Sequence, residues 1–100
     1  MNRMPSALGR RDKNEPEIIH AIEAVGGKVL PLVIGGGVPD LLVLYDGVLH
    51  LLEIKTEHGQ LNAKQIKFMT EWPVSVVRTP SQALDSIGVE LDERCRLAGL

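Results

Sequence analysis

The chain has 100 residues, of which 44% are hydrophobic and 24% are charged, and these proportions are typical of one soluble globular domain. It contains no apolar run long enough to cross a membrane and no apolar N-terminal stretch typical of a signal peptide. Its single cysteine excludes an internal disulfide and a multi-cysteine zinc site, and its net charge of −2 weakens a role based on bulk attraction to nucleic acid. We therefore expect an intracellular, cytoplasmic domain with no membrane partner.

The N-terminal third of the chain predicts an arm, a helix and a strand. Residues 1–13 are polar and basic without periodicity, so we expect a flexible arm ahead of a single domain over residues 14–100. The first helix is expected to begin at Asn14, because Asn is a favourable N-cap residue. An apolar strand is expected over residues 28–34, where Pro31 favours an edge position or a bulge.

A tight hairpin is the strongest local signal in the sequence. Residues 41–45 and 48–54 are apolar runs of strand type, and Asp46-Gly47 between them is typical of a two-residue turn. Counting outward from this turn sets Asp40 opposite Glu53. Directly opposed residues lie on the same face of a sheet with Cβ atoms about 5 Å apart, so the hairpin predicts two carboxylates at one point.

Lys55 is expected beside these two carboxylates, because side chains two residues apart in a strand share a face. It could be a simple salt-bridge partner of Glu53. One lysine cannot neutralise two acids, however, and Glu53 stands among apolar residues where an unpaired carboxylate is costly. The cluster of Asp40, Glu53 and Lys55 therefore favours a metal site with a catalytic lysine next to it.

The second half of the chain predicts a helix, a strand and a short helix. The helix is expected to begin after Asn62 as its cap and to end at Pro73. A strand over residues 74–77 and a short helix over residues 81–87 follow. The order helix, strand, hairpin, helix, strand predicts an α/β fold with a small mixed sheet and flanking helices. The hairpin strands are apolar at nearly every position, which is expected when both faces of a sheet are covered.

Five short elements, taken in order, resemble the PD-(D/E)xK nuclease superfamily, and the closer match is to its VRR-NUC branch. The resemblance extends over most of the chain, and its elements are 37–41, the strand segment 53–55, 59–61, Gln65 and 76–78. The first two elements alone would be weak, whereas five in order with a hairpin that joins the acids are strong.

The resemblance implies a restriction-endonuclease-like core and a metal-dependent DNA endonuclease. It implies Mg²⁺ or Mn²⁺ as the cofactor, held by Asp40, Glu53 and the backbone carbonyl of Ile54, with no small-molecule cofactor. Compact members of this branch resemble Holliday-junction resolvases and act as homodimers. Branched DNA, such as a four-way junction, and a second copy of the chain are therefore the expected partners.

Two further catalytic candidates, Glu15 and Gln65, also depend on the resemblance. Glu15 shares a helix face with the apolar Ile18 and Ile22, and the family has a glutamate there that completes the acidic cluster, acting on the metal through water. Glu17 is an alternative, and either acid could simply stabilise the first turn of its helix. Gln65 is expected near the site, although it could equally form a capping box with Asn62.

The sequence leaves other assignments open. Arg78 could face a substrate phosphate or pair with an acid, and His50 is expected on the face away from the acids as a structural residue. The alternative function is a non-catalytic nucleic-acid-binding module that retains the nuclease fold. A small interaction protein using the acidic tail leaves Glu53 unexplained.

Overall fold

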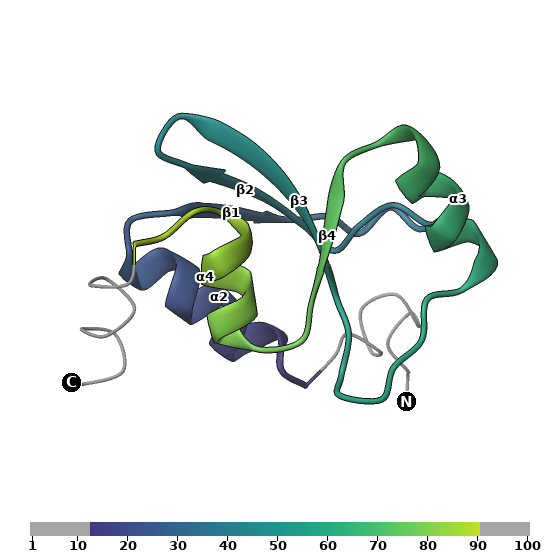
Figure 1. Cartoon of the computed structure of the whole chain (residues 1–100), viewed down its shortest axis with the longest axis horizontal. Coiled ribbons are helices and arrows are strands. Elements are labelled where there is room, and N and C mark those ends of the chain that lie inside the picture. Colours follow the sequence, from purple (N-terminus) through teal and green to yellow (C-terminus); the bar gives the residue numbers. More distant parts are fainter. Residues whose placement is uncertain (1–12, 91–100) are drawn as a thin grey trace, which may run out of the picture.

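The computed structural model of the chain describes residues 13–90, which form a sheet with helices on its two sides (Figure 1). The expected arm over residues 1–13 therefore lies, except for Lys13, outside the described residues. The elements, in chain order, are α2 (Glu15–Ala24), β1 (Lys28–Pro31), β2 (Leu41–Tyr45), β3 (Val48–Ile54), α3 (Ala63–Glu71), β4 (Val74–Val77) and α4 (Pro80–Ser86). Within this part of the chain, no helix is long and apolar enough to span a membrane.

The four strands form one small mixed sheet, as the sequence predicts, and their order in it is β1-β2-β3-β4. The β1–β2 and β2–β3 pairs are antiparallel, whereas the β3–β4 pair is parallel. β1 lies at the edge, which agrees with the Pro31 in it, because proline cannot donate to a neighbouring strand. It ends at Pro31 and not at residue 34, because β2 begins at Leu41, the partner of Pro31. One further hydrogen bond joins the Leu32 N–H to the carbonyl oxygen of Asp40 at 2.7 Å.

The hairpin has the predicted register. Tyr45 is paired with Val48 and Val43 with His50, and the turn residues Asp46 and Gly47 have φ values of 52° and 78°. Positive φ at both central residues is the geometry that this two-residue turn requires. The next positions beyond the ladder are Asp40 and Glu53, and the Asp40 N–H donates to the carbonyl oxygen of Leu52 at 3.1 Å.

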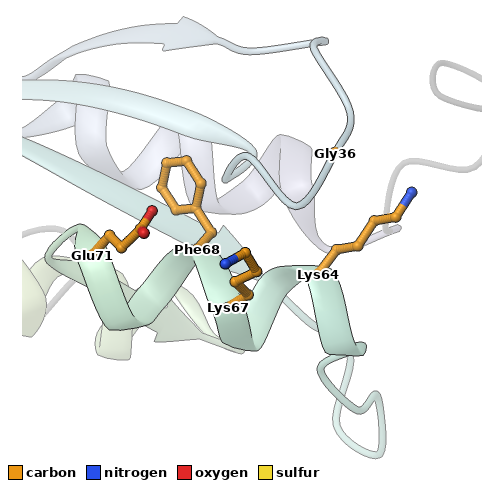
Figure 2. Close-up of a pocket in the computed structure, with 5 residues that line it drawn as sticks. All are labelled: Gly36, Lys64, Lys67, Phe68 and Glu71. Carbon is orange, nitrogen blue, oxygen red and sulfur yellow. The ribbon is translucent and has the colours of Figure 1, made fainter.

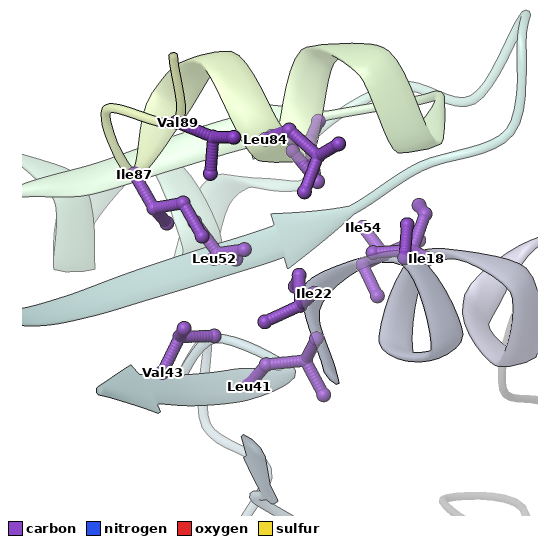
Figure 3. Close-up of a cluster of buried hydrophobic side chains, with 12 residues drawn as sticks. Ile18, Ile22, Leu41, Val43, Leu52, Ile54, Leu84, Ile87 and Val89 are labelled. Carbon is purple, nitrogen blue, oxygen red and sulfur yellow. The ribbon is translucent and has the colours of Figure 1, made fainter. Parts of the chain in front are cut away.

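One face of the sheet carries the hydrophobic core. Helices α2 and α4 pack side by side against this face (Figure 1). Their apolar side chains meet those of the strands, with Ile18, Ile22, Leu41 and Leu52 all fully buried (Figure 3). His50 faces the same side, and burial lowers its pKa from 6.5. It therefore lies away from the acids and is structural, as expected.

The opposite face of the sheet is only partly covered, so the expectation that both faces are buried is wrong. Helix α3 lies on this side and contacts it near Glu53, but none of the α3 residues is fully buried. Closer to the hairpin turn, Leu30, Leu44 and Leu49 are 57%, 37% and 65% exposed. We call these three leucines the open apolar face. A nine-residue helix is too short to cover them.

Candidate active site

The hairpin brings Asp40 and Glu53 together at the end of the sheet away from the turn. Asp40 directly precedes β2 and accepts a hydrogen bond from the Ile54 N–H, at 2.8 Å from its Oδ2. The structure therefore brings the two carboxylates together at this end of the sheet, as the predicted register requires.

Glu53 is the member of this pair with the strongly perturbed pKa. Its side chain is 4% exposed, and burial together with the charge of Asp40 raises its pKa to about 8, against a smaller opposing effect of Lys55. A side-chain hydrogen bond between Glu53 and Asp40 acts in the same direction. Two ionised carboxylates this close repel each other, so a cation between them would be favourable.

Lys55 lies beside Glu53, with its Nζ 3.6 Å from Glu53 Oε2 and its side chain 16% exposed. Its backbone is anchored by Asn14, whose Nδ2 donates to the carbonyl oxygens of Lys55 at 3.0 Å and of Arg78 at 2.8 Å. Asn14 is the N-cap residue of α2, but its side chain does not cap the helix. It ties the start of α2 to the ends of β3 and β4 instead.

Gln65 performs both of the roles that the sequence left open. Its Oε1 accepts from the Asn62 N–H at 2.9 Å and its N–H donates to Asn62 Oδ1 at 2.9 Å, which is a complete capping box. Its Nε2 donates to Glu53 Oε2, also at 2.9 Å. Because the capping box occupies the amide oxygen, the amide nitrogen is directed at Glu53. The helix cap therefore orients a site residue.

Glu15 is buried in the first turn of α2, at 6% exposure, whereas Glu17 is exposed. This agrees with the preference for Glu15 on the apolar side of the helix. Within residues 13–90, however, no group of three or more His, Cys, Asp or Glu side chains lies close enough to hold a metal ion. Direct metal ligation by Glu15 together with Asp40 and Glu53 is therefore absent there, and its action through a water molecule stays a prediction.

Arg78 contacts the backbone of a neighbouring loop. Its guanidinium donates to the carbonyl oxygens of Thr56 at 2.6 Å and Gly59 at 2.9 Å, and more weakly to that of Glu57. These carbonyls belong to the loop that follows Lys55, so Arg78 holds this loop against β4. No local sequence signal reveals this contact or that of Asn14, because the partners are 19 to 64 residues apart.

The glycine loop before Asp40 packs against the site helix. Gly37 has a φ of +89°, and a Cβ there would fall within 2.6 Å of backbone atoms of Lys64. The backbone therefore approaches α3 at a distance that only glycine permits. Gly37 thus fixes the spacing between the segment leading to Asp40 and the helix that carries Gln65.

One solved structure resembles this fold over most of both chains. It is described as a VRR_NUC domain, has 27% sequence identity and a TM-score of 0.58, and the match covers 83% of this chain and 96% of that one. No protein-family model and no curated protein matches the sequence. The class that the fold defines is a nuclease-fold domain. More narrowly, this chain has the VRR-NUC fold, as the five sequence elements predict.

The residues at this point suit a divalent cation. Carboxylate and carbonyl oxygens are the ligands that Mg²⁺ and Mn²⁺ prefer. Asp40 and Glu53 supply carboxylate oxygens, and the resemblance implies the carbonyl of Ile54, whose N–H donates to Asp40, as a further ligand. The charge of Asp40 helps to raise the pKa of Glu53, and a bound cation would offset that charge.

Proposed function

We propose that the chain is a divalent-metal-dependent DNA endonuclease that hydrolyses phosphodiester bonds. The observation that carries the proposal is the pair of a half-buried Asp40 and a buried Glu53 next to Lys55, with the pKa of Glu53 raised to about 8. The VRR-NUC fold supports it. An acid pair that costs folding free energy at neutral pH is readily explained by a ligand that the pair binds.

In this proposal, Asp40, Glu53 and the Ile54 carbonyl hold Mg²⁺ or Mn²⁺. When bound, the ion supplies Lewis-acid polarisation of the phosphate and lowers the pKa of a coordinated water. Lys55 orients the attacking water or stabilises the negative charge that develops on the phosphate. Gln65 fixes the rotamer of Glu53 through its 2.9 Å hydrogen bond and positions water or phosphate, and Glu15 acts through water.

We further propose branched DNA as the substrate and a homodimer as the active form, working inside the cell. The open apolar face supports the dimer, because exposed leucines grouped on one sheet face are typical of interaction surfaces. Leu44 and Leu49 lie next to the hairpin turn and Leu30 pairs with Leu42 in the middle of β2, whereas the acids lie at the end of β2 and β3 away from the turn. A second copy on this face can therefore leave the acids accessible, and two symmetric sites suit a two-fold-symmetric junction.

The direct test is cleavage of labelled four-way junction, flap and linear duplex DNA with Mg²⁺ or Mn²⁺. Lys55→Ala should reduce cleavage at least about 100-fold, because it removes the only lysine beside Glu53 in the described part of the chain. Lys28→Ala, at the far end of β1, is the matched control and should cleave like the wild type.

The alternative, a non-catalytic nucleic-acid-binding module, predicts a different result. Both the wild type and Lys55→Ala would then bind branched DNA with equal affinity and cleave none of it with either metal ion. That outcome would overturn the nuclease proposal and leave the nuclease fold with a binding role.

A further inference from the structure

An open pocket of about 350 Å³ lies between α3 and the glycine loop (Figure 2). Its walls are formed by Gly36, Lys64, Lys67, Phe68 and Glu71. In Figure 2 the Phe68 ring stands on the side of α3 that faces the strands, with Lys64 toward one end of the helix and Glu71 toward the other. The acids of the candidate active site take no part in this pocket.

The aromatic ring in this pocket belongs to a stack. Phe68 and Trp72 lie with ring centroids 5.6 Å apart and planes 13° from parallel. Trp72 is 53% exposed, and Phe68 is only partly buried. Large aromatic side chains are normally buried in the core. Phe68, in contrast, lies on a helix with no buried residue, and Trp72 directly follows that helix. A planar ligand could extend the stack on Phe68 with little rearrangement.

Two cations border the same ring. Lys64 and Lys67 are exposed and lie one helical turn apart, on the side of α3 that faces the glycine loop. Aromatic rings next to lysines are the features by which proteins hold single-stranded nucleic acid, the ring stacking on a base and the lysines contacting phosphates. Glu71 disfavours a phosphate at its own end of the pocket, so the phosphate is expected near Lys64.

We propose that this pocket binds one unpaired nucleotide of the DNA substrate, with its base on Phe68 and its phosphate at Lys64 and Lys67. This inference rests on the proposed nuclease function and gives it a substrate feature. Lys64 is adjacent to Gln65, which donates to Glu53, and Gly37 next to Gly36 packs on the Lys64 backbone. A base that is unstacked at a branch point would therefore be held close to the scissile phosphate.

The test uses the single tryptophan of the chain, Trp72, as its reporter. An unlabelled oligo(dT) 12-mer is titrated into the full-length protein in Ca²⁺ buffer while Trp72 fluorescence is recorded, and a duplex of the same length is the comparison ligand. The wild type should show saturable quenching and bind the single strand more tightly than the duplex. Phe68→Ala should weaken binding about tenfold, whereas Ile66→Ala, on another side of α3, should have no effect.

The lysines are tested in the double variant Lys64→Gln/Lys67→Gln, whose exposed positions tolerate substitution without loss of the fold. The slope of log K against log salt concentration measures the number of phosphate contacts. Removing two such contacts should make this slope shallower by about 1.4. Lys28→Gln should leave the slope unchanged. Wild-type affinity and slope in the double variant, or equal binding of single strand and duplex by the wild type, would overturn the pocket proposal.

This experiment separates the pocket from the nuclease function. It measures binding without cleavage, so its result does not depend on whether the protein hydrolyses DNA. A protein that cleaves DNA but binds oligo(dT) independently of Phe68 and both lysines refutes the pocket alone. A protein that cleaves nothing, but whose oligo(dT) binding depends on them, supports the pocket and refutes the nuclease.

Discussion

The burial of Glu53 is unfavourable for folding, whereas the proposed metal site requires this carboxylate. It is nearly inaccessible to solvent and lies against a second acid, so burial and the Asp40 charge raise its pKa to about 8. The folded protein therefore retains a proton that the unfolded chain loses at a pKa of 4.5. The contribution of this proton to stability is fully present below pH 4.5 and is lost as the pH rises through 8.

Glu53→Gln should remove this pH dependence, because the amide is neutral at every pH. Without divalent ions, the variant and the wild type should unfold at similar temperatures at pH 5. At pH 9 the variant should be more stable, with a midpoint higher by about 5 °C or more, since each kcal/mol shifts a domain of this size by about 4–8 °C. Thermal unfolding followed by circular dichroism measures both midpoints.

The control for this prediction is Glu57→Gln, which changes an 87% exposed glutamate in the next loop. The unfolding temperature of Glu57→Gln should differ from that of the wild type by the same amount at pH 5 and at pH 9. A Glu53→Gln variant that is no more stable than the wild type at pH 9 would contradict the raised pKa.

Residue positions could be predicted from the sequence where they follow from local geometry. The Asp46-Gly47 turn determines the register, and the register brings Asp40 opposite Glu53. The roles of Asn14 and Arg78 could not be predicted, because both side chains bind backbone carbonyls that only the folded chain brings near. Gln65 both completes the capping box and lies beside Glu53, because its amide oxygen and its amide nitrogen bind different partners.

At the scale of elements, α3 combines a structural cap with a site contact, and the two can be separated. Asn62→Ala removes one side of the capping box, and it should cost about 1 kcal/mol of stability while most of the cleavage activity is retained. Gln65→Ala removes the other side and the donor to Glu53. It should have a similar cost in urea unfolding but reduce cleavage at least about tenfold.

Equal cleavage by Asn62→Ala and Gln65→Ala, at equal stability, would show that the contact with Glu53 has no role in the reaction. The comparison is therefore made at a temperature at which both variants remain folded.

The junction between the glycine loop and α3 depends on Gly37. Gly37→Ala forces a Cβ into the Lys64 backbone at a φ of +89°, so it should destabilise the fold by about 2 kcal/mol or more. Gly36→Ala is the matched control, because its φ is +65° but no atom lies within 4 Å of the added Cβ. It should cost only the conformational strain, about 1 kcal/mol. Urea unfolding measures both, and equal losses would contradict the close packing.

At the scale of the whole molecule, the open apolar face predicts self-association. The wild type should sediment at twice the chain mass of 10.9 kDa at micromolar concentration. Leu49→Glu should shift it to the monomer, because the charge would be buried in the interface. Val48→Glu is the control, since Val48 is 53% exposed but its side chain points to the other face of the hairpin. A monomeric wild type would contradict the dimer.

The sequence predicts the order and type of all the elements named, and it fails on the coverage of the sheet. Apolar residues at nearly every position of β2 and β3 indicate two covered faces. The structure supplies two helices for one face and a single short helix for the other. An apolar strand pattern is the same whether a sheet face is covered by helices of its own chain or by another molecule.

The most direct test of the central claim, that Asp40 and Glu53 hold a divalent ion, is calorimetric titration with Mn²⁺ at pH 7 in two buffers of different ionisation enthalpy. Because Glu53 has a pKa of about 8, a bound ion must displace its proton. We expect about one ion per chain and release of about one proton, and no binding by Glu53→Gln. Binding of Mn²⁺ by that variant at wild-type affinity, or no binding by the wild type, would contradict the account.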